Sequence, residues 1–96
     1  MDDTTAITVL YNGMLTIPPV DGTVSIFAHS ARATGVTLTN LRYPLTNATL
    51  TYTRPLGISN EMLGLPASIS VSRGSLVVVF PVQAIDHVIR HMNTKK

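Results

Sequence analysis

Two histidines near the C-terminus have a spacing that could support metal chemistry. His87 and His91 are four residues apart, which on a helix places both side chains on nearly the same side, as in helical zinc sites. Arg90 lies between them and would repel a cation, so a third ligand would have to come from His29 or Asp86. Two ligands make neither a closed nor a catalytic zinc site. The sequence therefore predicts a solvated helix face there and no metal centre.

Serine and threonine are abundant, but a hydroxyl nucleophile needs a histidine and usually an acid beside it. The chain lacks the Gly-x-Ser-x-Gly turn that presents such a serine. Its six glycines are scattered singly and form no phosphate-binding loop. The hydroxyls recur at alternate positions, which is typical of one face of a strand. We therefore predict no catalytic residue, no cofactor and no enzymatic activity.

Arginine beside tyrosine is a third candidate chemistry, because bases of single-stranded nucleic acid stack on aromatic rings next to guanidinium groups. The supporting positive charge is thin, with a formal net charge of +2 and a pI of 9.4. Since phosphate contacts supply most of such affinity, nucleic-acid binding ranks below the other hypotheses. The residues that would carry it are Arg42, Tyr43, Tyr52 and Arg54.

Charge is scarce in the whole chain and unevenly distributed. Only 12% of the residues are charged, against about 25% in an ordinary domain. Residues 4–20 and 74–85 contain no charged side chain. A free-standing domain normally keeps itself soluble with a charged surface. We therefore expect part of this surface to be covered by another molecule.

Length and composition bound the architecture. Ninety-six residues with 45% hydrophobic content suit one domain over 1–96, with a frayed N-terminus at 1–5 and a tail at 94–96. The absence of cysteine rules out disulfides. The acidic, polar start is not that of a signal peptide, and the uncharged stretches are too short to span a membrane. These features predict an intracellular protein without a transmembrane segment.

Apolar and polar residues alternate with period two, which predicts a chain rich in strands. Asn12-Gly13 lies between two such runs, 6–11 and 14–17, and predicts a hairpin. Arg73-Gly74 predicts a second hairpin in the same way. Asn60 is expected to cap a short helical turn. The remaining predicted strands are 23–29, 36–41, 48–53, 67–72 and 75–80.

The strand at 76–80 is apolar on both faces, so it belongs in the middle of a sheet that is covered on both sides. A C-terminal helix supplies that cover through an apolar stripe of Ile85, Val88, Ile89 and Met92. We expect an α+β, β-rich fold. It would be a small antiparallel sheet or half-barrel of five to seven short strands, with one C-terminal amphipathic helix at about 82–93.

These patterns favour a small, non-enzymatic interaction or assembly protein that self-associates through a charge-poor sheet surface, as a homodimer or larger. Small size, no cysteine and sparse charge are also the composition expected of a viral or phage accessory protein, with a host or assembly protein as a further partner. The candidate interface residues are Ile7, Val9, Tyr11, Met14, Leu15, Ile17, Thr49, Thr51 and Thr53.

Two alternative functions use the same elements. The apolar strands could enclose a lipid-like ligand in a cavity within one chain or between two. The second alternative is the weak binding of single-stranded nucleic acid through the two arginines and two tyrosines named above.

Overall fold

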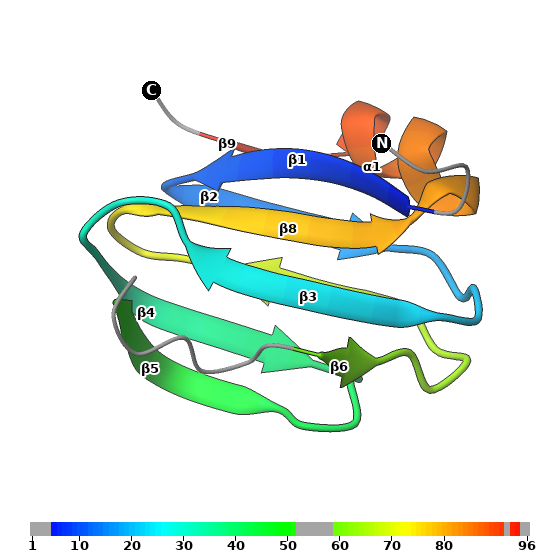
Figure 1. Ribbon diagram of the computed structural model, residues 1–96, viewed down its shortest axis with the longest axis horizontal. Helices are drawn as coiled ribbons and strands as arrows, with labels where there is room; N and C mark the ends of the chain where they lie inside the picture. The colour runs from blue at the N-terminus through cyan, green and yellow to red at the C-terminus, as the bar shows by residue number, and fades with distance from the viewer. Residues whose placement is uncertain (1–4, 52–58, 92, 95–96) are drawn as a thin grey trace.

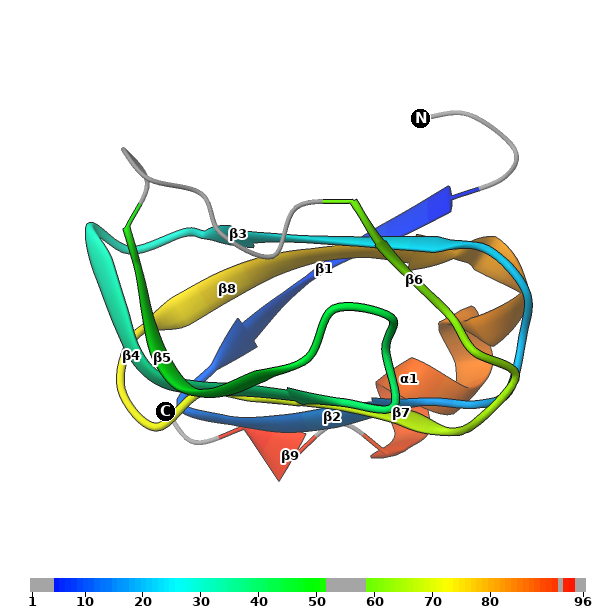
Figure 2. The same cartoon turned by 90° about the horizontal axis from the view of Figure 1, so that it is seen from below.

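Two antiparallel sheets face each other and share one core (Figure 1; Figure 2). The structure is a computed structural model that describes residues 5–51, 59–91 and 93–94, with side chains up to Val88. One sheet has the strand order β1 (Thr5–Tyr11), β8 (Ser75–Pro81), β3 (Thr23–Ala28) and β6 (Asn60–Glu61). The other has the order β5 (Leu45–Thr51), β4 (Arg32–Thr39), β7 (Ala67–Ser70), β2 (Gly13–Ile17) and β9 (Asn93–Thr94).

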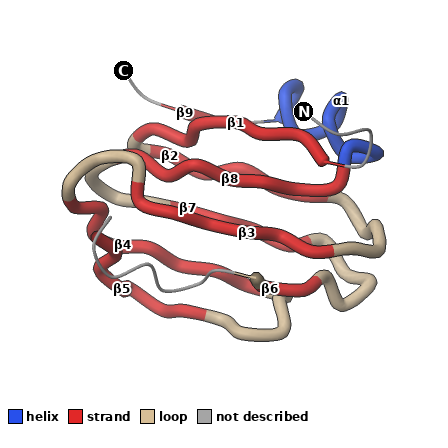
Figure 3. Tube along the Cα trace, in the orientation of Figure 1, coloured by secondary structure: helices blue, strands red, loops and turns tan. Residues whose placement is uncertain are grey.

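Two helical elements follow β8 near the end of the chain. A single 3-10 turn, η1 (Val82–Ala84), leads directly into the short helix α1 (Ile85–His91). Figure 3 shows these as the only blue segments in an otherwise red and tan trace of the described residues. The prediction of a β-rich α+β fold with antiparallel pairing and one short C-terminal helix is confirmed.

Alternation of side chains builds both sheets as the sequence pattern predicts. In β3 the buried side chains are Val24, Ile26 and Ala28, and in β7 Ala67 and Ile69 point inward in the same way. β4 begins earlier than predicted, and its pairing with β5 shifts register between Ala33 and Val36. The two short strands β6 and β9, which have two residues each, escaped prediction because no alternation is visible over that length.

The predicted N-terminal hairpin is wrong, because its two strands belong to different sheets. β1 pairs along its whole length with β8, whereas β2 pairs with β7 and β9. A two-residue hairpin turn of this kind needs positive φ at both central residues, and here only Asn12 has it, with φ 43°. The chain therefore crosses from one sheet to the other at Asn12-Gly13.

The second predicted hairpin fails for the same reason. β7 lies between β4 and β2, and β8 lies between β1 and β3 in the opposite sheet. The turn at Arg73-Gly74 therefore also carries the chain between sheets. Consequently β1 and β2, and likewise β7 and β8, connect the two layers instead of extending one of them.

The helix lies at one end of the two layers, not over the outer side of β8 (Figure 2). It packs mainly against β2, and Ala84 and Val88 enter the core. Ile85 was predicted to belong to the buried stripe, but it is 39% exposed. The strand β8 is central, as predicted, yet Val77 and Val79 on its outer side remain half-buried. Within the described residues, no helix has the length and apolar character that a membrane span requires.

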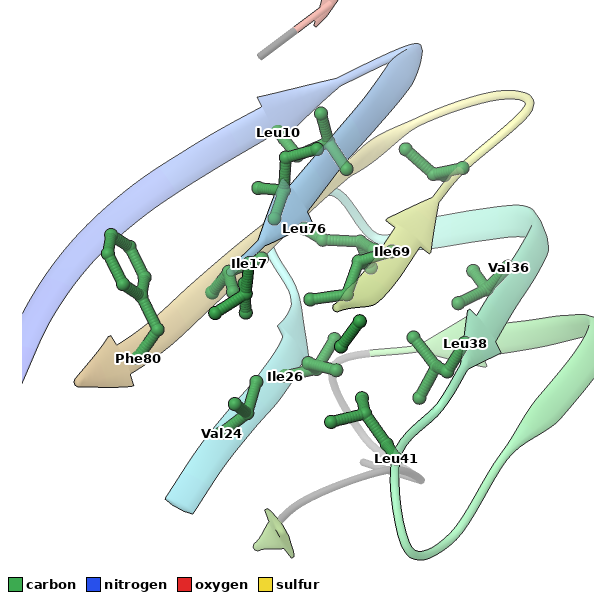
Figure 4. Close-up of a cluster of buried hydrophobic side chains, with 14 of the residues drawn as sticks. Leu10, Ile17, Val24, Ile26, Val36, Leu38, Leu41, Ile69, Leu76 and Phe80 are labelled. Atoms are coloured by element: carbon green, nitrogen blue, oxygen red, sulfur yellow. The ribbon is translucent and has the colours of Figure 1, made fainter. Parts of the chain in front are cut away.

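The core lies between the two sheets (Figure 4). Leu10, Leu76 and Phe80 from one sheet meet Ile17 and Ile69 from the other, and none of the five is more than 1% exposed. Burying one such side chain contributes about 1.5–3 kcal/mol. Because both layers contribute to one cluster, neither sheet has a core of its own.

Candidate functional site

The two crossings between the sheets lie side by side and form the first polar cluster, which we call the crossover junction: Asn12, His29, Ser30, Gly74 and Ser75. The backbone N–H of Asn12 donates to the carbonyl of Gly74 at 3.1 Å. The Gly74 N–H donates in return to Asn12 Oδ1 at 2.8 Å. The two points at which the chain changes sheet are thereby tied to each other.

Ser30 and His29 complete the junction. The N–H of Ser75 donates to Ser30 Oγ at 3.1 Å, and the same hydroxyl donates to the carbonyl of Arg32 at 2.9 Å. His29 Nδ1 lies 3.0 Å from Ser75 Oγ. A serine–histidine contact of this kind could suggest a nucleophile, but Ser75 is only 2% exposed. A substrate cannot reach its hydroxyl, so this cluster is structural.

The second polar cluster is centred on Asn60, which is fully buried. Its Oδ1 accepts the N–H of Tyr43 at 2.8 Å and that of Glu61 at 3.1 Å. Its Nδ2 donates to the carbonyl of Tyr43 at 2.7 Å. We call this arrangement the Asn60 clasp, because one side chain holds both backbone polar groups of Tyr43. The predicted role of Asn60 as a helix cap is wrong, since the residue begins strand β6.

Backbone pairing reinforces the clasp on both sides. The N–H of Arg42 donates to the carbonyl of Glu61 at 3.0 Å, and the N–H of Met62 donates to the carbonyl of Gly22 at 3.0 Å. β6 itself pairs with β3. The segment after β4 is therefore fixed to the edge of the opposite sheet.

Three exposed side chains stand on this fixed backbone, and we call them the Arg42–Tyr43–Glu61 platform. Arg42 donates from a terminal nitrogen to Glu61 Oε2 at 3.0 Å, with side-chain exposures of 57% and 52%. The Arg42 guanidinium carbon lies 5.6 Å from the centroid of the Tyr43 ring. The hydrogen bond to Glu61, and then the proximity of Tyr43, raise the pKa of Arg42 above its ordinary value.

Ser59 adds backbone strain next to the platform. Four non-glycine residues of the described chain have positive φ, and three of them are asparagines, the type that tolerates this region best. Ser59, with φ 60°, is the exception. Non-glycine residues in this region cost about 1–3 kcal/mol and cluster at ligand sites. An exposed ring, a carboxylate and a strained turn together are suited to recognising a planar, cationic ligand.

A model of one protein family matches residues 15–76, which contain the Asn60 clasp and the whole platform. That family is described as the vitamin B1 binding domain of thiamin pyrophosphokinase. This chain belongs to that family. Among proteins with curated functions, none matches the chain.

Solved structures agree with the family assignment. The thiamin pyrophosphokinase of Geobacillus thermodenitrificans is 31% identical, with a TM-score of 0.75 over 82% of this chain and 38% of its own. The thiamine pyrophosphokinase of Bacillus subtilis is 27% identical, with the same TM-score and the same coverage of both chains. A thiamin pyrophosphokinase family protein of Enterococcus faecalis, 21% identical with a TM-score of 0.67 over all of this chain and 39% of its own, shares the fold. This chain thus spans less than half the length of the enzymes it resembles.

Family membership overturns the functional hypothesis drawn from composition. The chain is a domain of an enzyme family, not a viral or phage accessory protein, and the prediction of a non-enzymatic assembly protein was wrong. The lipid-carrier and nucleic-acid alternatives are displaced by the same match. Composition misled because scarce charge is a property of the surface and contains no information on what a site binds.

The predicted interface residues on β1 do form a coherent surface. Ile7 is 61% exposed, Val9 42% and Tyr11 49%. Ile7 lies opposite Val79, and Val9 opposite Val77, which in turn faces Phe27 on β3. We call Ile7, Val9, Tyr11, Phe27, Val77 and Val79 the apolar outer face.

The other interface candidates are divided between the core and the opposite surface. Leu15 and Ile17 are fully buried, so they are part of the core and cannot contact a partner. Met14 is 45% exposed, and Thr49 and Thr51 lie on the outer side of β5, exposed and half-buried respectively. Thr53 lies outside the described residues.

The second surface is covered by hydroxyl groups. On the outer side of the five-stranded sheet Ser68 pairs with Thr16 and with Thr39, and Ser70 pairs with Thr37. The hydroxyls of Thr39 and Ser68 are hydrogen-bonded at 2.6 Å. The two outer faces of the molecule therefore differ sharply in chemistry although neither contains a charge at these positions.

The residues proposed for nucleic-acid binding are only partly placed together. Arg42 and Tyr43 are adjacent on the platform, whereas Tyr52 and Arg54 lie outside the described residues. The sequence predicted a frayed N-terminus at 1–5 and a tail at 94–96. Of these residues, Thr5 lies in β1 and Thr94 lies in β9. The residues described contain no group of three or more His, Cys, Asp or Glu side chains that could hold a metal ion.

Sequence reasoning missed Asn60 and Glu61 as site residues. Their partners lie 17 and 19 positions earlier in the chain, and no local pattern reports such a contact. The available signal was the polar triplet at 59–61 inside a long connection, because connections more often carry function than the strands they join.

Proposed function

We propose that this chain binds thiamin and presents it for pyrophosphorylation. The single observation behind the proposal is the family match over residues 15–76, which contains the platform and its clasp. The likeness to two thiamin pyrophosphokinases with a TM-score of 0.75 supports it.

The reaction would need more protein than this chain. Because the chain corresponds to 38% of those enzymes, we propose that the groups that bind and activate the pyrophosphate donor are supplied by a further polypeptide segment or a partner. The role of the present chain is then to hold the acceptor.

The platform is the proposed contact surface for the vitamin. Thiamin has a positively charged thiazolium ring and a neutral aminopyrimidine ring. The carboxylate of Glu61 would face the thiazolium charge, and the ring of Tyr43 would offer an aromatic face to it. The Asn60 clasp would hold both groups in place, since a ligand-binding side chain must not relax away from its ligand.

Titration calorimetry with thiamin tests this proposal. Glu61→Gln removes the carboxylate and should weaken binding about tenfold, as expected for the loss of one charge-assisted contact. Asp86→Asn is the matched control, because Asp86 is exposed on α1 and its replacement should leave the affinity unchanged. Equal effects of the two substitutions would exclude Glu61 as a contact, and no binding of thiamin by the unchanged chain would exclude the function.

We also propose that the chain self-associates through the apolar outer face. The occupant is a second copy, because a surface without charge is complementary to itself and a symmetric dimer buries the same patch twice. β1 is a terminal strand of its sheet, and its outer residues are among the most exposed large apolar side chains of the described chain.

Sedimentation velocity tests the self-association. Ile7→Glu places a charge on the most exposed apolar residue of the proposed contact and should convert a dimer into a monomer. Thr49→Glu adds the same charge to the opposite outer face and should leave the dimer intact. A monomeric unchanged chain at tens of micromolar, or equal effects of the two variants, would overturn this proposal.

A further inference from the structure

The Arg42 side chain makes two contacts, and both involve groups of the proposed ligand site. Its guanidinium donates to Glu61 Oε2 at 3.0 Å and lies over the Tyr43 ring at 5.6 Å from the centroid. A guanidinium is a flat, delocalised cation that pairs with carboxylates and stacks on aromatic rings. Arg42 therefore shares with a thiazolium the properties by which such a site would recognise its ligand.

We propose that Arg42 is an internal placeholder that occupies the cation site of the free protein and is displaced by the cationic ring of the ligand. This inference rests on the proposed binding of thiamin, and it adds that Arg42 competes with the vitamin. Glu61 then exchanges one cation for another, and Tyr43 exchanges one flat partner for another. The net charge of the occupied platform is the same before and after the exchange.

The exposed position of Arg42 allows it to leave. The side chain is 57% exposed, and exposed ion pairs contribute little to stability. The groups left behind do not depend on the guanidinium for their position. Tyr43 and Glu61 are fixed through their backbones by Asn60, and the backbone of Arg42 itself is held by the carbonyl of Glu61.

The exchange has a consequence for selectivity. A cationic ligand replaces the contacts that Arg42 loses, whereas a neutral ligand of the same shape would leave Glu61 without a counter-ion. The placeholder therefore lowers the affinity of every ligand that displaces it by the same factor, and the preference for a cationic over a neutral ligand comes from Glu61.

Calorimetric titration of the full chain and its Arg42→Gln variant tests the proposal. The probes are thiamin and a neutral analogue in which carbon replaces the quaternary thiazolium nitrogen. Without the placeholder, thiamin should bind about two- to fivefold more tightly, the range expected for one exposed ion pair and one cation–aromatic contact. The neutral analogue should gain by a similar factor, because the cost of displacing Arg42 is common to both ligands, so the preference for thiamin over the analogue should stay unchanged.

Arg73→Gln is the matched control. It removes the same charge from the turn beside Gly74, at the crossover junction, and should leave the affinity for thiamin unchanged. Arg42→Lys keeps a positive charge but not the flat guanidinium, so its affinity should lie between those of the unchanged chain and Arg42→Gln.

The outcomes separate this inference from the function on which it rests. Tighter binding of thiamin by Arg42→Gln than by Arg73→Gln supports both. If the unchanged chain binds thiamin and Arg42→Gln binds it equally or more weakly, the proposed function stands and the placeholder is overturned. If neither the unchanged chain nor Arg42→Gln binds thiamin, both fall.

Discussion

The crossover junction and the Asn60 clasp are held by the same kind of hydrogen bond but differ in what surrounds it. In each, an asparagine side chain bonds the backbone of a segment far along the chain: Asn12 to Gly74, and Asn60 to Tyr43. At the junction the polar groups form hydrogen bonds with one another, and the Ser75 hydroxyl is buried. At the clasp the amide is buried, while a ring, a guanidinium and a carboxylate stand exposed above it.

This difference is the basis on which we propose a structural role for the junction and a ligand-binding role for the platform above the clasp. Hydrogen bonds alone do not distinguish the two, since both clusters have several. What distinguishes the clasp is that its rigid backbone supports side chains which point to solvent. We therefore expect substitutions at the junction to change stability without changing affinity, and substitutions at the clasp to change both.

Gly74→Ala should have the largest effect on stability. Gly74 has φ 110°, and a Cβ there would lie 2.6 Å from the Arg32 carbonyl oxygen and 2.9 Å from Ala33 Cα. Both are backbone atoms that cannot move aside, so the free energy of unfolding in urea should fall by at least about 3 kcal/mol.

Gly64→Ala is the control for that measurement. Gly64 also has positive φ, 77°, but a Cβ there would meet no atom within 4 Å. Only the backbone penalty remains, so the loss should be about 1 kcal/mol. Equal losses for the two glycines would show that the close approach of Gly74 to Arg32 and Ala33 adds nothing to the backbone penalty.

Asn60→Ala should follow, with a loss of about 2–4 kcal/mol in urea unfolding, because three hydrogen bonds to a buried amide disappear. The affinity for thiamin, measured by titration calorimetry, should fall as well, which distinguishes this variant from Gly74→Ala.

Asn40→Ala is the control. The side chain of Asn40 is exposed and donates to the carbonyl of Pro66 at 2.8 Å, so its replacement should leave the thiamin affinity unchanged. Unchanged thiamin affinity in folded Asn60→Ala would contradict a positioning role.

Asn12→Ala should have the smallest effect of the three on stability, about 1–2 kcal/mol. It loses the acceptor for Gly74 N–H and the tolerance of asparagine for φ 43°. Asn12→Gly restores the backbone tolerance but not the acceptor, so it should recover part of the loss. Thermal unfolding followed by circular dichroism measures both variants, and thiamin affinity should be unchanged in each. A fall in affinity would place the junction within the binding site.

The fold class was predictable because alternation and composition are local signals. The inward positions of β3 and β7 follow directly from period two, and the apolar strand at 76–80 is central as predicted. The two hairpins were not predictable in this way. A turn at Asn12-Gly13 or Arg73-Gly74 is compatible with a hairpin or with a change of sheet, and the choice depends on β1 meeting β8 across the whole chain.

The site was predictable only in part. Arg42 and Tyr43 are adjacent in sequence, and their pairing suggested recognition of a ligand, although of a different kind from the one we propose. Glu61 completes the platform and Asn60 supports it, through contacts between a connection and an edge strand. Such contacts depend on tertiary folding, so local propensity assigned Asn60 to a helix cap instead.

The pairing of β1 with β8 also has a consequence for the chain while it is being synthesised. Thr5 pairs with Pro81, so β1 leaves the ribosome long before β8, its neighbour among the described strands, is made. At about 5–20 residues per second, the interval is about 4–15 seconds. For that time a charge-free strand with Ile7 and Val9 lacks the strand with which it pairs in the folded protein, so we expect the nascent chain to bind chaperones until residue 81 emerges.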